Sequence, residues 1–207
     1  MKKAMKIIII AILLLVLIYI ATNLREAVII NKLSNKVMET QKLTNYYYKA
    51  KTESGINTAY RKDDKAIWRL ETEKDIKQIC SVDGNEVWLM VEDKNENSKT
   101  AVKVSANEGF IMPAILMDGS LYVENFWQAF LMSFISRTNS EKVNDRDCYK
   151  IYLDEDFQLF VNKEDYIKIK EINGSTSREL LEYSINTVTD SDVELPNLDG
   201  FKIIEGN

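Results

Sequence analysis

The chain has 207 residues, of which 45% are hydrophobic and 29% charged, with only 7 Gly and 2 Pro. This composition excludes collagen-like and low-complexity classes, and the length suits one domain with a core of its own. The net charge is −5, but Lys2, Lys3 and Lys6 come first and no acidic residue precedes Glu26; the 27 basic residues less these three leave 24 against 32 acidic ones, a net charge of −8 for the rest. Phosphate binding needs clustered Lys and Arg, so nucleic acid is not an expected partner.

The chain has no histidine and two cysteines, Cys80 and Cys148. Without imidazole the commonest general base and metal ligand are missing, and two distant thiols do not make a zinc site. A bridge between them would close a loop of about 70 residues and could stabilise by about 4 kcal/mol in an oxidising compartment. We nevertheless predict two free thiols, because Cys80 and Cys148 fall in different hairpins.

The N-terminal segment 7–21, IIIIAILLLVLIYIA, contains no charged residue. As a helix it covers about 22 Å, less than the roughly 30 Å of a hydrocarbon core, but Lys6 can snorkel and residues 22–24 lengthen the far end. Three lysines precede the apolar run, and positively charged flanks stay on the cytoplasmic side, so the N-terminal end of the helix is expected inside. We expect a cytoplasmic N-terminus at 1–6, a transmembrane signal-anchor at 7–23, and a single-pass protein of the cell membrane with its domain outside the cytoplasm.

A cleaved secretory signal has the same charged and apolar regions and remains an alternative, as does a buried core helix. Cleavage requires small residues one and three places before the cut. A cut after Ala21 puts Tyr19 at the critical position, and a cut after Asn23 ends on an unfavourable residue. No cysteine follows the apolar run, which excludes a lipoprotein anchor, so an uncleaved anchor is the prediction.

Residues 24–44 continue with apolar positions at helical spacing and no Gly or Pro, which predicts a helix leading into the domain. From Asn45 the period changes to two, and Asp83-Gly84-Asn85 is a strong hairpin signal. The predicted strands of this part are Tyr46–Thr52, Asn57–Arg61, Ala66–Glu71, Ile76–Val82, Glu86–Glu92 and Thr100–Ser105.

Alternation within these strands predicts a sheet with one dry and one wet face. In the third run Ala66, Trp68 and Leu70 share one side, and in the fifth Trp88 and Met90 share one side. We interpret all five side chains as belonging to the dry face.

The strand pattern is then interrupted. Residues 106–124, with two Gly and one Pro, look irregular, and Asn125–Thr138 carries Phe126, Phe130 and Phe134 at helical spacing. Two interpretations stay open for this aromatic helix: it packs on the sheet as ordinary core, or it covers a cavity over the sheet.

Strands resume after the helix and are joined by Asp-, Asn- and Gly-containing turns as a meander. They are Cys148–Leu153, Phe157–Val161, Tyr166–Asn173 and Glu179–Val188. About ten antiparallel strands in one sheet would not stay flat and open. The predicted fold class is α+β, mostly antiparallel β: a transmembrane helix, then at 45–207 a strongly curved, unclosed β-barrel-like sheet with one or two helices covering its concave face.

This order of elements resembles the lipoprotein-carrier family (LolA/LolB-like). The resemblance covers most of residues 25–204 and is carried by the early helix and by the stretches 57–70, 82–93, 145–174 and 190–204. It implies an unclosed β-barrel with helices on the concave side, and the binding of lipid or acylated protein. Soluble carriers are cleaved and acylated receptors begin with a lipid-bearing cysteine, whereas this chain is expected to stay tethered by its own helix.

The chemistry of known catalytic motifs is missing: the sequence has no phosphate loop, nucleophile elbow, dinucleotide fingerprint or EF-hand loop. The acidic clusters at Asp63-Asp64, Asp154–Asp156 and Asp190–Asp192 fall at predicted turns, where Asp is favoured for backbone reasons. We therefore expect no enzymatic activity, no metal and no cofactor. A hydrolase with two facing carboxylates is a third alternative that only geometry identifies.

Two binding functions remain: a tethered binder of apolar ligands such as lipid or acylated peptide, and an envelope protein-interaction or sensory domain with no small-molecule ligand. Under the first, rigid aromatic and apolar side chains line a space between the aromatic helix and the dry face. The predicted walls of that space are Trp68, Trp88, Met90, Phe130, Phe134, Tyr149 and Ile151.

Overall fold

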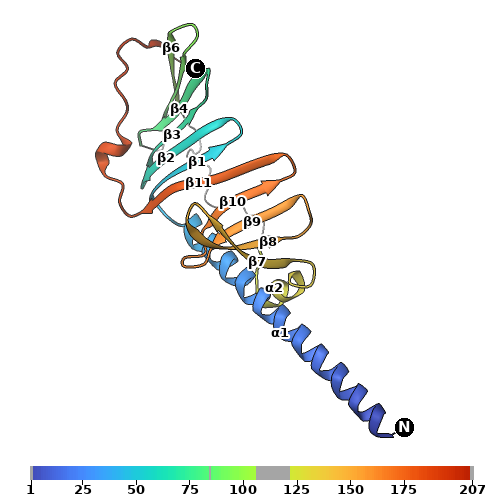
Figure 1. Cartoon of the computed structure of the whole chain (residues 1–207). Helices are drawn as coiled ribbons and strands as arrows, with labels where there is room; N and C mark the ends of the chain where they lie inside the picture. The colour runs from blue at the N-terminus through green and yellow to red at the C-terminus, as the bar shows by residue number, and fades with distance from the viewer. Residues whose placement is uncertain (1, 84, 106–121, 206–207) are drawn as a thin grey trace.

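The computed structural model describes residues 2–83, 85–105 and 122–205. It begins with α1 (Lys2–Gln41), one continuous helix of 40 residues that joins the predicted span to the predicted leading helix. No Gly or Pro occurs within it, and it ends where the backbone N–H groups of Lys42 and Leu43 donate to the carbonyls of Glu39 and Thr40. Figure 1 shows α1 as a rod with a bare N-terminal half and a second half that lies against the sheet.

The two halves of α1 meet different surroundings. The large apolar side chains from Ile7 to Ile20 are all exposed, whereas Ala27, Ile30 and Leu33 are 0 to 3% exposed against the sheet. The first half is long and apolar enough to cross a membrane. A core helix would bury these side chains, and this one does not.

In the described part of the chain, twelve strands form one sheet in the order β12-β6-β5-β4-β3-β2-β1-β11-β10-β9-β8-β7. All neighbours pair antiparallel except β12, which lies parallel to β6. The strands are β1 (Asn45–Thr52), β2 (Gly55–Lys62), β3 (Lys65–Glu71), β4 (Asp75–Ser81), β5 (Glu86–Asp93), β6 (Ser98–Ser105), β7 (Arg137–Val143), β8 (Arg146–Tyr152), β9 (Phe157–Asn162), β10 (Lys168–Asn173), β11 (Thr176–Ile185) and β12 (Lys202–Glu205). Two meanders, β1–β6 and β7–β11, are joined where β1 pairs with β11.

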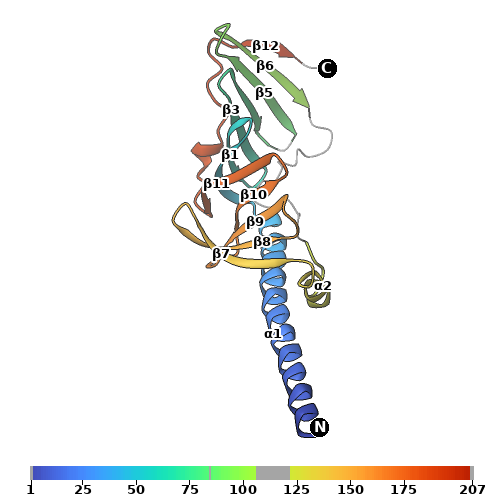
Figure 2. The same cartoon turned by 45° about the vertical axis from the view of Figure 1, so that its right-hand side comes forward.

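The sheet is curved and unclosed, with β12 and β7 at its two edges (Figures 1 and 2). A register shift in β1 between Lys49 and Ala50 adds local bending at the junction of the meanders. The predicted fold class, an α+β protein with a mostly antiparallel, unclosed sheet after a long apolar helix, is confirmed.

Local turn chemistry explains the hairpins. The Asp83 carboxylate accepts hydrogen bonds from the backbone N–H groups of Asn85 and Glu86, although Gly84 itself lies outside the described residues. The Asp154 carboxylate does the same for the β8–β9 turn. Gly174 follows β10 with φ +58°, a conformation that favours glycine. The acidic residues at these turns thus have backbone roles.

The predicted strands are all present, but two further strands were not predicted. β7 is polar and largely exposed on both faces, so it has no apolar alternation for a pattern to reveal. β12 has only four residues. The aromatic helix is also shorter than predicted: α2 (Phe126–Met132) gives way to a turn, and β7 begins at Arg137. Of the predicted irregular stretch, 106–121 lies outside the described residues.

Two clusters of buried apolar side chains lie on opposite faces of the sheet. The first packs α1 against β1–β3 and β8–β11, and we call that side of the sheet the inner face. The second comprises Ile67, Cys80, Trp88, Met90 and Ala101. The C-terminal tail after the short helix η2 (Asp190–Val193) covers this second cluster on the outer face with Leu195, Leu198 and Phe201.

Candidate functional site

The seven side chains predicted to line one space are divided by the structure. Ile151 is fully buried in the first cluster, and Trp68, Phe130 and Tyr149 pack against it half-buried. Trp88 and Met90 are buried in the second cluster, on the other face of the sheet, and Phe134 is 43% exposed with its ring 5.0 Å from that of Phe130. Although the first four belong to one cluster, Trp68 in β3 lies six strand positions from Tyr149 and Ile151 in β8, so the predicted walls do not line one space.

Strand register is the reason for the division. Trp68 lies opposite Ile79, which lies opposite Leu89. Trp88 is the neighbour of Leu89 in β5, so its side chain points to the other face of the sheet. The sequence shows alternation within each strand, but the face that two strands share depends on the pairing between them. Assigning Trp88 and Met90 to the same dry face as Trp68 was wrong.

The aromatic helix also lies elsewhere than predicted. α2 packs on α1: the rings of Tyr19 and Phe134 are 5.9 Å apart, and the Ser133 hydroxyl donates to the Asn23 side-chain oxygen at 3.4 Å. Both views of the molecule place α2 beside α1 (Figure 2). The prediction that this helix covers the dry side of the sheet is corrected, because the buried stripe of α1 already occupies that position.

An apolar row on the inner face is the candidate site. The pairing registers align one side chain from each of five neighbouring strands, β3, β4, β5, β6 and β12. They are Trp68, Ile79, Leu89, Val102 and Ile204. We call this set the apolar row. At the usual strand spacing of about 4.8 Å, its four steps extend over roughly 19 Å.

The apolar row becomes more exposed with distance from α1. Trp68, Ile79 and Val102 are half-buried, while Leu89 is 38% and Ile204 43% exposed. Among the described residues, the cluster that contains α1 reaches only as far as Ala66 and Trp68 in β3. Apolar side chains aligned on a sheet face and left exposed to this degree form a surface suited to an apolar partner.

Two polar features accompany the row. The indole N–H of Trp68 is buried and has no hydrogen-bond partner among the described residues, a situation that costs about 1–3 kcal/mol. In the flanking row of the same face, Lys77 lies between Leu70 and Val91 and forms an ion pair with Asp75 at 3.2 Å.

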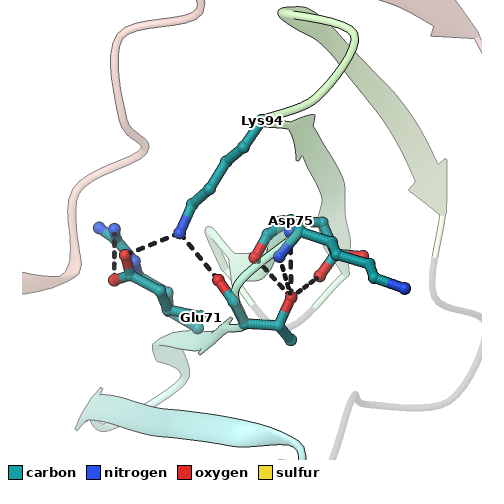
Figure 3. A network of polar contacts seen from close by, with 6 residues as sticks. Glu71, Asp75 and Lys94 are labelled. Atoms are coloured by element: carbon teal, nitrogen blue, oxygen red, sulfur yellow. Dashed lines mark hydrogen bonds and ion pairs between the residues drawn. The ribbon is translucent and has the colours of Figure 1, made fainter.

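A polar network at the end of β3 has a structural role (Figure 3). The Glu71 carboxylate binds Lys94 and Arg69, each at 3.1 Å, and hydrogen bonding to Lys94 lowers the pKa of Glu71. Lys94 also donates to the Thr72 carbonyl, and the Thr72 hydroxyl donates to Asp75 at 2.6 Å, which lowers the pKa of Asp75. The network fastens the β3–β4 turn to the β5–β6 turn, and its carboxylates are ionised at neutral pH.

Two hollows among the described residues are lined by side chains other than the predicted walls. In the described ranges no group of three or more Cys, Asp or Glu side chains is arranged to hold a metal. A hollow of about 550 Å³ on the outer face is lined by polar and aromatic side chains, among them Tyr47, Tyr60 and Arg69. A cavity of about 10 Å³ between β1, β10 and β11 holds at most one water.

Comparison with models of known protein families finds no match to this chain, and comparison with curated proteins finds none either. Four members of the apolar row, Ile79, Leu89, Val102 and Ile204, were missed by sequence reasoning. The sequence signal that could have found them is the alternation within the predicted strands, which places each residue on one side of its own strand. The missing information was the register that aligns those sides.

Proposed function

We propose that this chain is a membrane-tethered, extracytoplasmic binding domain for apolar ligands such as lipid or acylated peptide, and that the apolar row is its contact surface. The single observation that carries the proposal is the alignment of apolar side chains across five strands with Leu89 and Ile204 left exposed. Its roughly 19 Å length suits an extended acyl chain.

The tether is part of the proposal. Its N-terminus is inside, because Lys2, Lys3 and Lys6 flank the apolar run on one side, and the domain stands outside the cytoplasm. Retention of residues 7–23 is supported by the continuity of α1, whose burial against the domain begins at Asn23. Kinship with the lipoprotein carriers belongs to the same proposal and is supported by an open, curved sheet with a helix on its concave face. We propose binding without catalysis.

Binding of an environment-sensitive fluorescent fatty acid to the detergent-purified protein tests the proposal. We expect saturable binding, and Leu89→Glu should raise the Kd about tenfold or more, because the new carboxylate must be desolvated against the acyl chain. The matched pair is in β12: Ile204→Glu on the row should weaken binding, and Ile203→Glu on the other face should not. Both side chains are exposed, 43% and 53%, so neither substitution creates a buried charge.

An envelope protein-interaction or sensory domain without a small-molecule ligand is the second candidate. The observation that favours it is the close-packed first cluster, in which α1 fills the inner face over β1 and β8–β11. Absence of saturable binding by folded protein, or equal binding by the two β12 variants, would contradict the ligand proposal and favour this function.

A further inference from the structure

α2 and the turn after it present an exposed apolar face. Trp127 and Leu131 are four residues apart in α2, so they lie on one side of the helix, and Ile135 follows in the turn. The three side chains are 73%, 66% and 63% exposed. The opposite side is anchored: Ala129 is fully buried and Ser133 is 2% exposed. Three large apolar side chains held outward by a fixed helix are unusual for a surface in contact with water.

This face is continuous with the membrane helix. Ring contacts run from Trp127 to Phe130 at 5.9 Å, from Phe130 to Phe134 at 5.0 Å, and from Phe134 to Tyr19 of α1 at 5.9 Å. On α1, Tyr19 is 57% exposed. The exposed apolar surface thus passes without a break from α1 to α2, and Figure 1 shows α2 at the end of the domain that faces the bare half of α1.

The level of α2 along α1 coincides with the outer boundary of the bilayer. The uncharged stretch from Ile7 to Leu24 covers about 27 Å as a helix, close to the roughly 30 Å of a hydrocarbon core, so the outer boundary of that core lies near Leu24. Tyr19 contacts Phe134, and Asn23 accepts a hydrogen bond from Ser133; both Tyr19 and Asn23 lie in the last turns of α1 before this boundary. Arg25 on α1 and Arg137 after the α2 turn, both exposed, follow at the level of the headgroups. Trp and Tyr are enriched at this depth in membrane proteins.

We propose that α2 and residues 133–135 are immersed in the outer leaflet of the bilayer that α1 crosses, so that the domain has two membrane contacts and a fixed orientation. The occupant of the exposed face is lipid at the boundary of headgroup and acyl chain. The apolar run 7–21 is short for a span, and the exposed face of α2 adds apolar surface beside its outer end. This inference rests on the tether proposed above but not on ligand binding by the apolar row.

Trp127 fluorescence in liposomes tests the inference. The full chain with Trp68→Phe and Trp88→Phe retains Trp127 alone; it is reconstituted in vesicles with or without lipids brominated near the headgroup end of the acyl chain. We expect blue-shifted emission, weak quenching by aqueous acrylamide and roughly a twofold loss of fluorescence with brominated lipid. The control moves the only Trp to β12, through Trp127→Phe and Ile203→Trp, where acrylamide should quench and brominated lipid should not.

Each outcome decides the inference. Quenching of Trp127 by acrylamide, as at residue 203, means that the face is in water, and shielding from both quenchers means that protein covers it; either result overturns the proposal. If Trp68→Phe and Trp88→Phe disturb folding, the emission and quenching of Trp127 can be obtained by subtracting the fluorescence of Trp127→Phe from that of the wild-type chain. Trp127 is exposed, so this single substitution should leave the fold intact. Failure of the protein to float with the vesicles would instead contradict the tether.

Discussion

The two halves of the sheet have opposite relations to α1. Over β1 and β8–β11, α1 covers the inner face and the side chains there, such as Tyr48, Ile151 and Leu159, are almost fully buried. Over β3–β6 and β12 the same face carries the apolar row, with Leu89 and Ile204 exposed, and it is the outer face that the C-terminal tail covers. The inner face is thus buried beneath α1 in one half of the sheet and partly exposed in the other half.

Thiol reactivity should show the largest effect, and it tests whether the outer cluster of the second half is closed. Burial raises the pKa of the Cys80 thiol to about 11, so the thiolate forms only as the pH rises toward that value. At pH 8 about one thiol in a thousand is ionised, against about one in four for a free cysteine, so alkylation should be slower than for a free cysteine by a factor of a few hundred. Intact mass after timed alkylation measures the rate.

The same experiment addresses the cysteine pairing. Both cysteines are free and buried, and six strands lie between β4 and β8 in the sheet, so the structure does not pair Cys80 with Cys148. In denaturant both should be alkylated without reductant. A requirement for reductant would disprove this arrangement.

A matched pair of truncations compares the halves directly. Ile151→Ala removes a side chain that is 0% exposed in the first cluster and should lower the free energy of unfolding by about 3–4 kcal/mol. Leu89→Ala acts on a side chain that is 38% exposed and should cost less than about 1 kcal/mol. Denaturant titration followed by circular dichroism measures both. Similar losses would mean that the two halves are equally buried.

The smallest effect is expected at the polar network. Lys94→Met removes the ion pair with Glu71, whose side chain is 45% exposed, so the loss should be about 0.5 kcal/mol and should shrink at high salt. The same denaturant titration at low and high salt checks it, with Lys99→Met, in a comparable exposed pair with Glu92, as the control. A loss of several kcal/mol would give the network a larger role than fastening two turns.

Hairpins and the long apolar N-terminal helix could be predicted from the sequence because their signals are local. Asp83 and Asp154 cap turns beside them in the chain, and the apolar run of α1 needs no partner to be recognised. The apolar row could not be predicted from the sequence. The alignment of Trp68 with Ile79 and Leu89 depends on the pairing between strands, which a single strand's pattern does not reveal. The aromatic helix was misplaced because a periodic apolar face does not reveal whether sheet, helix or lipid lies against it.

The most direct test of the account is to locate a bound acyl chain on the protein. A photoreactive fatty acid is cross-linked to the full-length protein in detergent, and the modified peptides are mapped by mass spectrometry with unlabelled fatty acid as competitor. The account predicts competitor-sensitive labels within β4 and β5, centred on Ile79 and Leu89, and loss of those labels in Leu89→Glu. Competitor-sensitive labels confined to the outer face, or no competitor-sensitive labels at all, would contradict it.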